Sequence, residues 1–149
     1  MNYVAPLGGD VLLVKVSDAG SPGTFTHPCL INTDRSLEMS ANATATELAD
    51  CADQSAPAKI VRKVKSTDIK VSGAGVLDAT SALAFMQWLL AGTTKDVKIT
   101  QNTTGALGGW TITGAFLLTA FNITGRRGDY QECTLTLEQA DIPSLAANA

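Results

Sequence analysis

Residues 64–92, VKSTDIKVSGAGVLDATSALAFMQWLLAG, decide the fold, because the hydrophobic period changes within them. The stretch alternates like a β-strand up to the Gly73–Gly75 bend and then repeats like an amphipathic helix, with Asp78 or Thr80 placed to cap its start. The apolar face of this helix is expected to consist of Ala82, Phe85, Met86, Leu89 and Leu90. We therefore predict one α-helix at about residues 78–91, with this face packed into the core.

The rest of the chain is mostly short, Thr-rich and alternating, which indicates β-strands separated by turns. Strand-like runs occupy residues 10–17, 24–33, 60–72, 95–101, 109–113, 115–124 and 130–139. Short antiparallel strands at this spacing are typical of a sandwich or barrel, and one helix can cover an open edge. The predicted fold is therefore mainly β, a β-sandwich or barrel with one flanking helix. We expect a single domain over residues 1–149, with a peripheral C-terminal tail at 141–149.

Residues 42–57, NATATELADCADQSAP, differ from the strands around them because they are small, polar and acidic, without a stable period. A loop of this length inside a compact domain is commonly functional. The sequence predicts a long extended loop here. Two interpretations remain open, a mobile surface loop and an arm that becomes ordered against a neighbouring subunit.

Opposite charges accompany this predicted arm. Its acids are followed by a basic cluster that ends at Lys70, while the net charge of the chain is −3. That balance argues against binding nucleic acid by neutralising phosphates. The cluster is therefore interpreted as a solvated strand face or a subunit contact, with a polyanion patch as the minor alternative. In a subunit contact, opposite charges on two copies would fix the register.

A second possible contact is the glycine-bracketed hairpin loop at residues 125–129. The candidate interface residues are Glu47, Asp50, Asp53, Lys59, Arg62, Lys63, Lys65, Arg126 and Arg127.

The sequence offers little for catalysis. The single histidine, His27, and Cys29 would lie on one strand face with parallel side chains, which is a poor geometry for a nucleophile and its base. One histidine and three scattered cysteines have no zinc-ligand spacing, and Gly73–Asp78 departs from GxGxxG at its third glycine. No signal peptide or membrane span is visible at the start. We expect a protein that is not an enzyme, with no catalytic, cofactor or metal site and no membrane anchor.

Several segments, in their order and spacing, are similar to a known family. They are His27–Cys29, the stretch at 32–40, Asp50–Asp53 with Ala56–Pro57, Gly73–Leu77, the helix with Trp88, and Gly92 before KDVKI. Over about residues 9–140 the chain resembles the major tail tube protein of long-tailed, non-contractile bacteriophages and related phage-like particles.

This resemblance implies a structural virion protein that self-assembles into stacked hexameric rings, the tail tube. The implied partners are further copies of the chain, a tape measure protein, and the tail tip and tail terminator proteins. Double-stranded DNA would pass through during ejection without specific binding. The implied location is the virion tail, after synthesis and assembly in the bacterial host cytoplasm.

Two alternatives remain open. One is a needle-like tube subunit of a secretion system. The other is a β-barrel that binds single-stranded nucleic acid and stacks bases on Trp88 and Trp110. For a tube subunit, we expect function to lie in the sheet edges and the arm, not in the helix.

Overall fold

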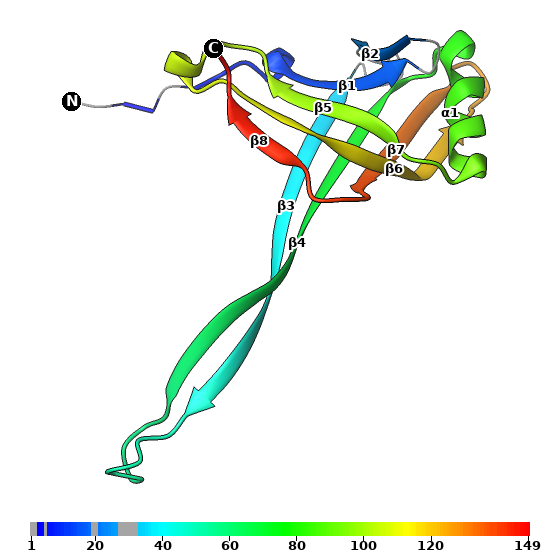
Figure 1. Cartoon of the computed structure of the whole chain (residues 1–149). Coiled ribbons are helices and arrows are strands. Elements are labelled where there is room, and N and C mark those ends of the chain that lie inside the picture. Colours follow the sequence, from blue (N-terminus) through cyan, green and yellow to red (C-terminus); the bar gives the residue numbers. More distant parts are fainter. Residues whose placement is uncertain (1–2, 5, 19–20, 27–32) are drawn as a thin grey trace.

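The computed structural model describes residues 3–4, 6–18, 21–26 and 33–149, and this part is mainly β-strand with one α-helix (Figure 1). The strands are β1 (Leu12–Asp18), β2 (Ser21–Thr26), β3 (Asp34–Leu48), β4 (Lys59–Val76), β5 (Lys95–Gln101), β6 (Trp110–Thr124), β7 (Glu132–Gln139) and β8 (Ser144–Ala147). The helix is α1 (Ala79–Ala91), and short 3-10 turns lie at Gly9–Val11 and Gly105–Leu107. The predicted mainly β fold with one helix is confirmed. The His27–Cys29 run, and with it most of the strand predicted at 24–33, lies outside the described residues.

The strands form one antiparallel sheet in the order β2-β1-β5-β6-β7-β4-β3, with β8 added beside β6. The sheet curls into a half-barrel, so that β1, near one end of the order, returns toward β3 at the other end (Figure 1). A side chain bridges this seam, because Arg35 Nη1 donates to the carbonyl oxygen of Leu12 at 2.8 Å. The curl therefore encloses a core within a single sheet.

The core lies on one face of the sheet, where every second residue of the strands points inward. The most deeply buried side chains are Val14, Val71, Val97, Ile99, Ile112, Phe116, Leu135 and Leu137. The helix α1 lies over β6 on this side, and the Phe85 ring stacks on Phe121 with 6.4 Å between ring centroids. The helix thus covers an open part of the half-barrel, as the sequence indicated.

Local signals set both ends of α1. The Asp78 carboxylate accepts hydrogen bonds from the Thr80 amide at 3.4 Å and the Ser81 hydroxyl at 2.7 Å. At the other end, Gly92 adopts a φ of 67°, a left-handed conformation that glycine enters without strain. These caps satisfy backbone groups that the helix leaves unpaired at its ends.

The predicted apolar face of α1 is wrong in two positions. The helix buries Ala82, Phe85 and Trp88, whereas Met86 is 41% exposed and Leu90 is 86% exposed. Trp88 determines the orientation because its ring packs in the core while its Nε1 donates to the Thr93 carbonyl oxygen at 2.7 Å. A large ring with one polar atom gains most when its apolar body is buried and that atom is paired.

The predicted loop at 42–57 needs a correction at its start. Residues 42–48 belong to β3, and only residues 49–58 are irregular. Alanine alternates with Asn or Thr from residue 41 to residue 46, which is a strand period of two. The small alanine side chains hide this period in a hydropathy pattern.

The C-terminal tail keeps exposed side chains, but its backbone joins the sheet instead of lying apart from it. β8 pairs with residues 110–113 of β6. Beyond it, Asn148 Nδ2 donates to the carbonyl oxygens of Gln101 and Thr103, both at 2.8 Å. The Thr111 hydroxyl donates to Asn148 Oδ1 at 2.6 Å. The tail is thus fixed by pairing with residues distant in the sequence.

Candidate assembly surfaces

The strands β3 and β4 form a long hairpin that leaves the body of the protein (Figure 1). They pair from Asp34 with Ala74 to Leu48 with Lys59, whereas β7 pairs with β4 only over Lys70–Val76. We call residues 41–67, the part of the hairpin beyond β7, the arm. A two-stranded ribbon is marginally stable in water, so further protein contacts are expected to cover it.

Large apolar side chains are exposed along this hairpin. The exposed fractions are 57% for Met39, 51% for Leu48, 53% for Ile60, 40% for Val61 and 55% for Val64. Apolar groups gathered on one exposed element mark an interaction surface. These residues are not among the predicted contacts, which rest on charge alone. The apolar residues of the stretch 60–64, IVRKV, are the signal for them in the sequence.

The backbone of the arm also has a local irregularity. Asn42 pairs with Ser66 and Ala43 pairs with Val64, so Lys65 has no residue opposite it. Such a β-bulge bends and twists a ribbon. The bulge therefore helps to set the direction in which the arm leaves the body.

The structure places seven of the predicted interface residues on the arm. On the paired strands, Ile60 lies opposite Glu47, and Lys59 lies opposite Leu48. Arg62 and Lys63 follow on β4, opposite Ala45 and Thr44. Among the described residues the one ion pair is Lys70–Glu138, at 3.2 Å, so these charges form no ion pair within that part of the chain.

Two of the acids have a local structural role at the tip. Asp50 Oδ1 accepts from the Ala52 amide at 2.8 Å. Asp53 Oδ1 accepts from the Ser55 hydroxyl at 2.6 Å and from the Ser55 amide at 3.1 Å. These hydrogen bonds to Ser55 lower the pKa of Asp53 below the ordinary aspartate value. The tip is therefore an ordered turn.

Arg126 and Arg127 lie away from the arm. They follow Thr124, which pairs with Glu132 of β7, and Glu132 in turn pairs with Val76 at the end of β4 opposite the arm. Both are exposed in the turn between β6 and β7. The structure does not bring them together with the other candidate residues.

A polar face lies on the side of the sheet opposite the core. Residues that pair across β3, β4 and β7 form three rows on this face, Glu38–Lys70–Glu138, Ser36–Ser72–Thr136 and Asp34–Ala74–Thr134. A fourth row contains only Val76 of β4 and Glu132 of β7. Four acids therefore accompany one base, Lys70, whose pKa is raised by its hydrogen bond and ion pair with Glu138. Small polar side chains fill most of the remainder. We call these residues the polar face.

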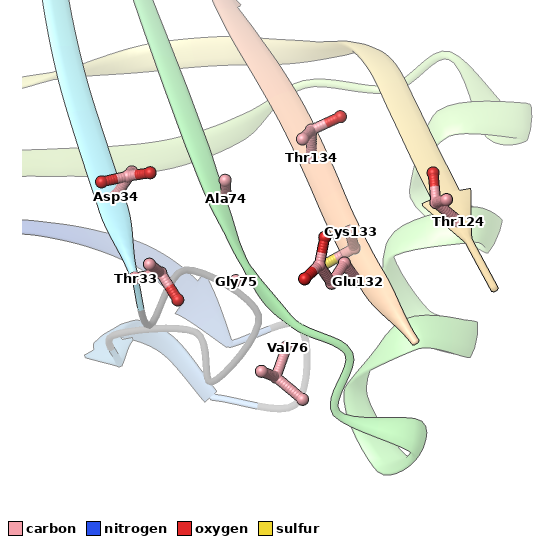
Figure 2. Close-up of a pocket in the computed structure, with 9 residues that line it drawn as sticks. All are labelled: Thr33, Asp34, Ala74, Gly75, Val76, Thr124, Glu132, Cys133 and Thr134. Atoms are coloured by element: carbon pink, nitrogen blue, oxygen red, sulfur yellow. The ribbon is translucent and has the colours of Figure 1, made fainter. Parts of the chain in front are cut away.

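A shallow pocket of about 290 Å³ lies at one end of the polar face (Figure 2). Asp34 and Glu132 provide carboxylates, and Thr33, Thr124 and Thr134 provide hydroxyls. The thiol of Cys133 is 2% exposed, and burial raises its pKa, which keeps it protonated and unreactive at neutral pH. The described lining thus contains no nucleophile with an adjacent base.

Within the described part of the chain, no three His, Cys, Asp or Glu side chains are grouped so that they could hold a metal ion. No helix there has the length and apolar character needed to cross a membrane.

The curled sheet and the uncovered arm are features that suit a structural protein that associates with further copies. The sequence matches the family described as phage tail tube protein over residues 7–141. The chain belongs to this family. Membership of a structural family favours a non-enzymatic role. Among curated proteins, none matches the sequence significantly.

Solved structures share this fold. A chain from the tail of an empty GTA particle, refined with C6 symmetry, has a TM-score of 0.71 and 21% identity, with 95% of this chain and 100% of that chain covered. The SPP1 tail tube has a TM-score of 0.65 and 9% identity, with 96% of this chain and 80% of that chain covered. A chain of the sheath-tube complex of an extracellular contractile injection system, PVC, has a TM-score of 0.60 and 15% identity, with 95% of this chain and 92% of that chain covered.

Proposed function

We propose that the protein is the structural subunit of a tail tube, in which hexameric rings stack into a hollow tube within the virion tail. The observation that carries the proposal is the arm, which leaves the body with its apolar side chains uncovered. Family membership and the likeness to a tail solved with C6 symmetry support the ring arrangement.

The arm serves as the main contact between copies. Burial of its apolar side chains supplies the driving force, at about 25 cal/mol for each Å² removed from water. The acids near its tip and the bases on its stem meet oppositely charged residues of adjacent copies, which fixes the register. Glu47 is the acid best placed for this contact, because Asp50 and Asp53 already accept hydrogen bonds in the turn.

Removal of the arm tests this assignment. Replacing residues 43–65 by Asn-Gly joins Asn42 to Ser66, which are already paired, through a two-residue hairpin turn. We expect a folded monomer with a thermal midpoint close to that of the full chain, because the core lies elsewhere. Tubes in negative-stain micrographs should be lost.

A matched control separates the arm from loop length in general. Replacing residues 51–55 at the tip by a Gly-Ser linker of equal length keeps both strands, and tubes should still form. If the armless variant unfolds, the arm belongs to the core; if it forms normal tubes, the arm is not the contact.

The polar face would line the channel of the tube. Four acids against one base give it a negative charge, which repels phosphates, and it has few large apolar groups to which DNA could adhere. DNA would pass through the channel without specific binding. The tube would assemble around a tape measure protein and end at tail tip and tail terminator proteins, after synthesis in the host cytoplasm. No cofactor is needed for this role.

A needle-like tube subunit of a secretion system is the second candidate, because the fold is also similar to that in the PVC sheath-tube complex. Capsid and tape measure genes beside the gene of this protein would favour the virion. Binding of single-stranded nucleic acid is disfavoured, because Trp88 is only 3% exposed and Trp110 is partly buried against the core, so neither ring offers an open platform for stacking bases.

A further inference from the structure

The helix α1 has a second apolar stripe on a side that the described residues leave uncovered. Leu83 is 61% exposed, Met86 is 41% exposed and Leu90 is 86% exposed. Their spacing of three and then four residues places them on one side of the helix. Residues 79–91 include no charged side chain. A helix without a charged face is one that a folded assembly buries.

This stripe is separate from the side that packs in the core. Ala82, Phe85 and Trp88 make the inner side, and the stripe lies next to it around the helix. The apolar content of α1 thus exceeds what one half-barrel can cover. This surplus apolar surface is available to a partner.

The arm has a surface that complements this stripe in size and charge. Ala41, Ala43 and Ala45 alternate along β3 and therefore point to one side, with Val64 opposite Ala43. These small side chains leave room for leucine and methionine side chains to approach the ribbon. The arm stem also carries Arg62, Lys63 and Lys65. In contrast, α1 carries no cation and begins beside the carboxylate of Asp78.

The two surfaces cannot meet within one chain. The arm leaves from the first half of β4, and α1 follows the other end of the same strand at Val76. The arm points away from α1 and extends for roughly 35 Å beyond Lys70, at about 3.3 Å per residue (Figure 1). Any contact between the surfaces therefore joins two copies.

We propose that, in the assembled tube, the alanine row of one copy's arm lies against Leu83, Met86 and Leu90 of a neighbouring copy. The inference rests on the proposed function, because it assumes assembly. A contact between two different surfaces of one chain leaves each copy with a free arm and a free stripe. Such heterologous contacts close into rings or propagate as filaments. The helix then takes part in assembly.

Charge introduced into the stripe tests the contact. In the double variant Leu83→Lys/Leu90→Lys both substituted positions are mostly exposed, so the circular dichroism spectrum and thermal midpoint should stay close to wild type. The critical concentration for tube formation should rise at least about tenfold, because a buried ammonium group beside the cationic arm stem has no partner and costs more than one decade of affinity. Leu107→Lys is the matched control, because Leu107 is 69% exposed in the 3-10 turn Gly105–Leu107, outside the helix. Normal assembly of the double variant would overturn the proposal.

A crosslinking experiment identifies the surface that contacts the stripe, and it does not depend on the double variant. The full chain carries a benzophenone amino acid in place of Leu90, forms tubes and is irradiated. Mass spectrometry should find adducts between two copies, with residues 41–48 or 59–67 at the other end. The same probe in place of Leu107 should not give those adducts. Adducts to another segment, or to a sheath-like protein in particles, would overturn the proposal while leaving the tube function intact. If the wild-type chain forms no tubes, both the function and this contact fail.

Discussion

Asp78 is the residue at which local chemistry and fold are most directly connected. Its carboxylate accepts from the Thr80 amide and from the hydroxyls of Thr80 and Ser81, so it satisfies donors at the start of α1. These hydrogen bonds lower the pKa of Asp78. The sequence could predict this cap because a cap requires only near neighbours. Asn148 could not be predicted, because its partners lie 45 and 47 residues away for two carbonyl oxygens and 37 away for Thr111.

A pH series on Asp78→Ala tests the cap. The folded-state pKa is depressed, so the stabilisation is present above the ordinary pKa of aspartate and is lost as the pH falls through the folded value. The variant should therefore have a lower thermal midpoint than wild type at pH 7. The gap between the two midpoints should narrow below about pH 4. Asp96→Ala removes a charge from an exposed position on β5 and serves as the control. A gap that stays constant down to pH 2 would contradict the cap.

At the scale of elements, α1 and the arm show what periodicity can and cannot decide. The bounds of α1 agree with the sequence to within a residue, because the period change and both caps are local. Its buried face was misplaced because apolar residues occur on two sides, and only the packing of Trp88 decides between them. The arm was predicted as a loop over 42–57 because alanines give no contrast against threonines. The short strand β8 lacks β-branched residues and depends on distant β6.

Charge reversal on the arm tests whether its charges guide assembly. Arg62→Glu/Lys63→Glu should abolish tubes, because both positions are exposed and would repel the acids of the adjacent copy. The neutral variant Arg62→Gln/Lys63→Gln should assemble more weakly than wild type but better than the reversal. Mixing the reversal variant with a Glu47→Lys variant should restore part of the light scattering that reports tube formation. Equal assembly of wild type, the neutral variant and the reversal variant would show that the charges have no role.

At the scale of the whole molecule, one curled sheet provides three kinds of surface. Its inner face makes the core, its opposite face is polar and acidic, and the strands β3 and β4 extend beyond the body as the arm. Alternation in the sequence could predict that strands have two faces. It could not assign the second face, because threonine and glutamate suit solvent, a channel or a neighbouring copy equally well. That assignment depends on the assembly.

The measurement that most directly tests the tube is a cryo-EM helical reconstruction of the purified, concentrated protein. We expect rings of six copies, as in the tail solved with C6 symmetry, with the polar face toward the channel and each arm on a neighbouring copy. A protein that remains monomeric at every concentration and in the presence of its tape measure protein, or a tube in which the arm is free in solvent, would contradict the account.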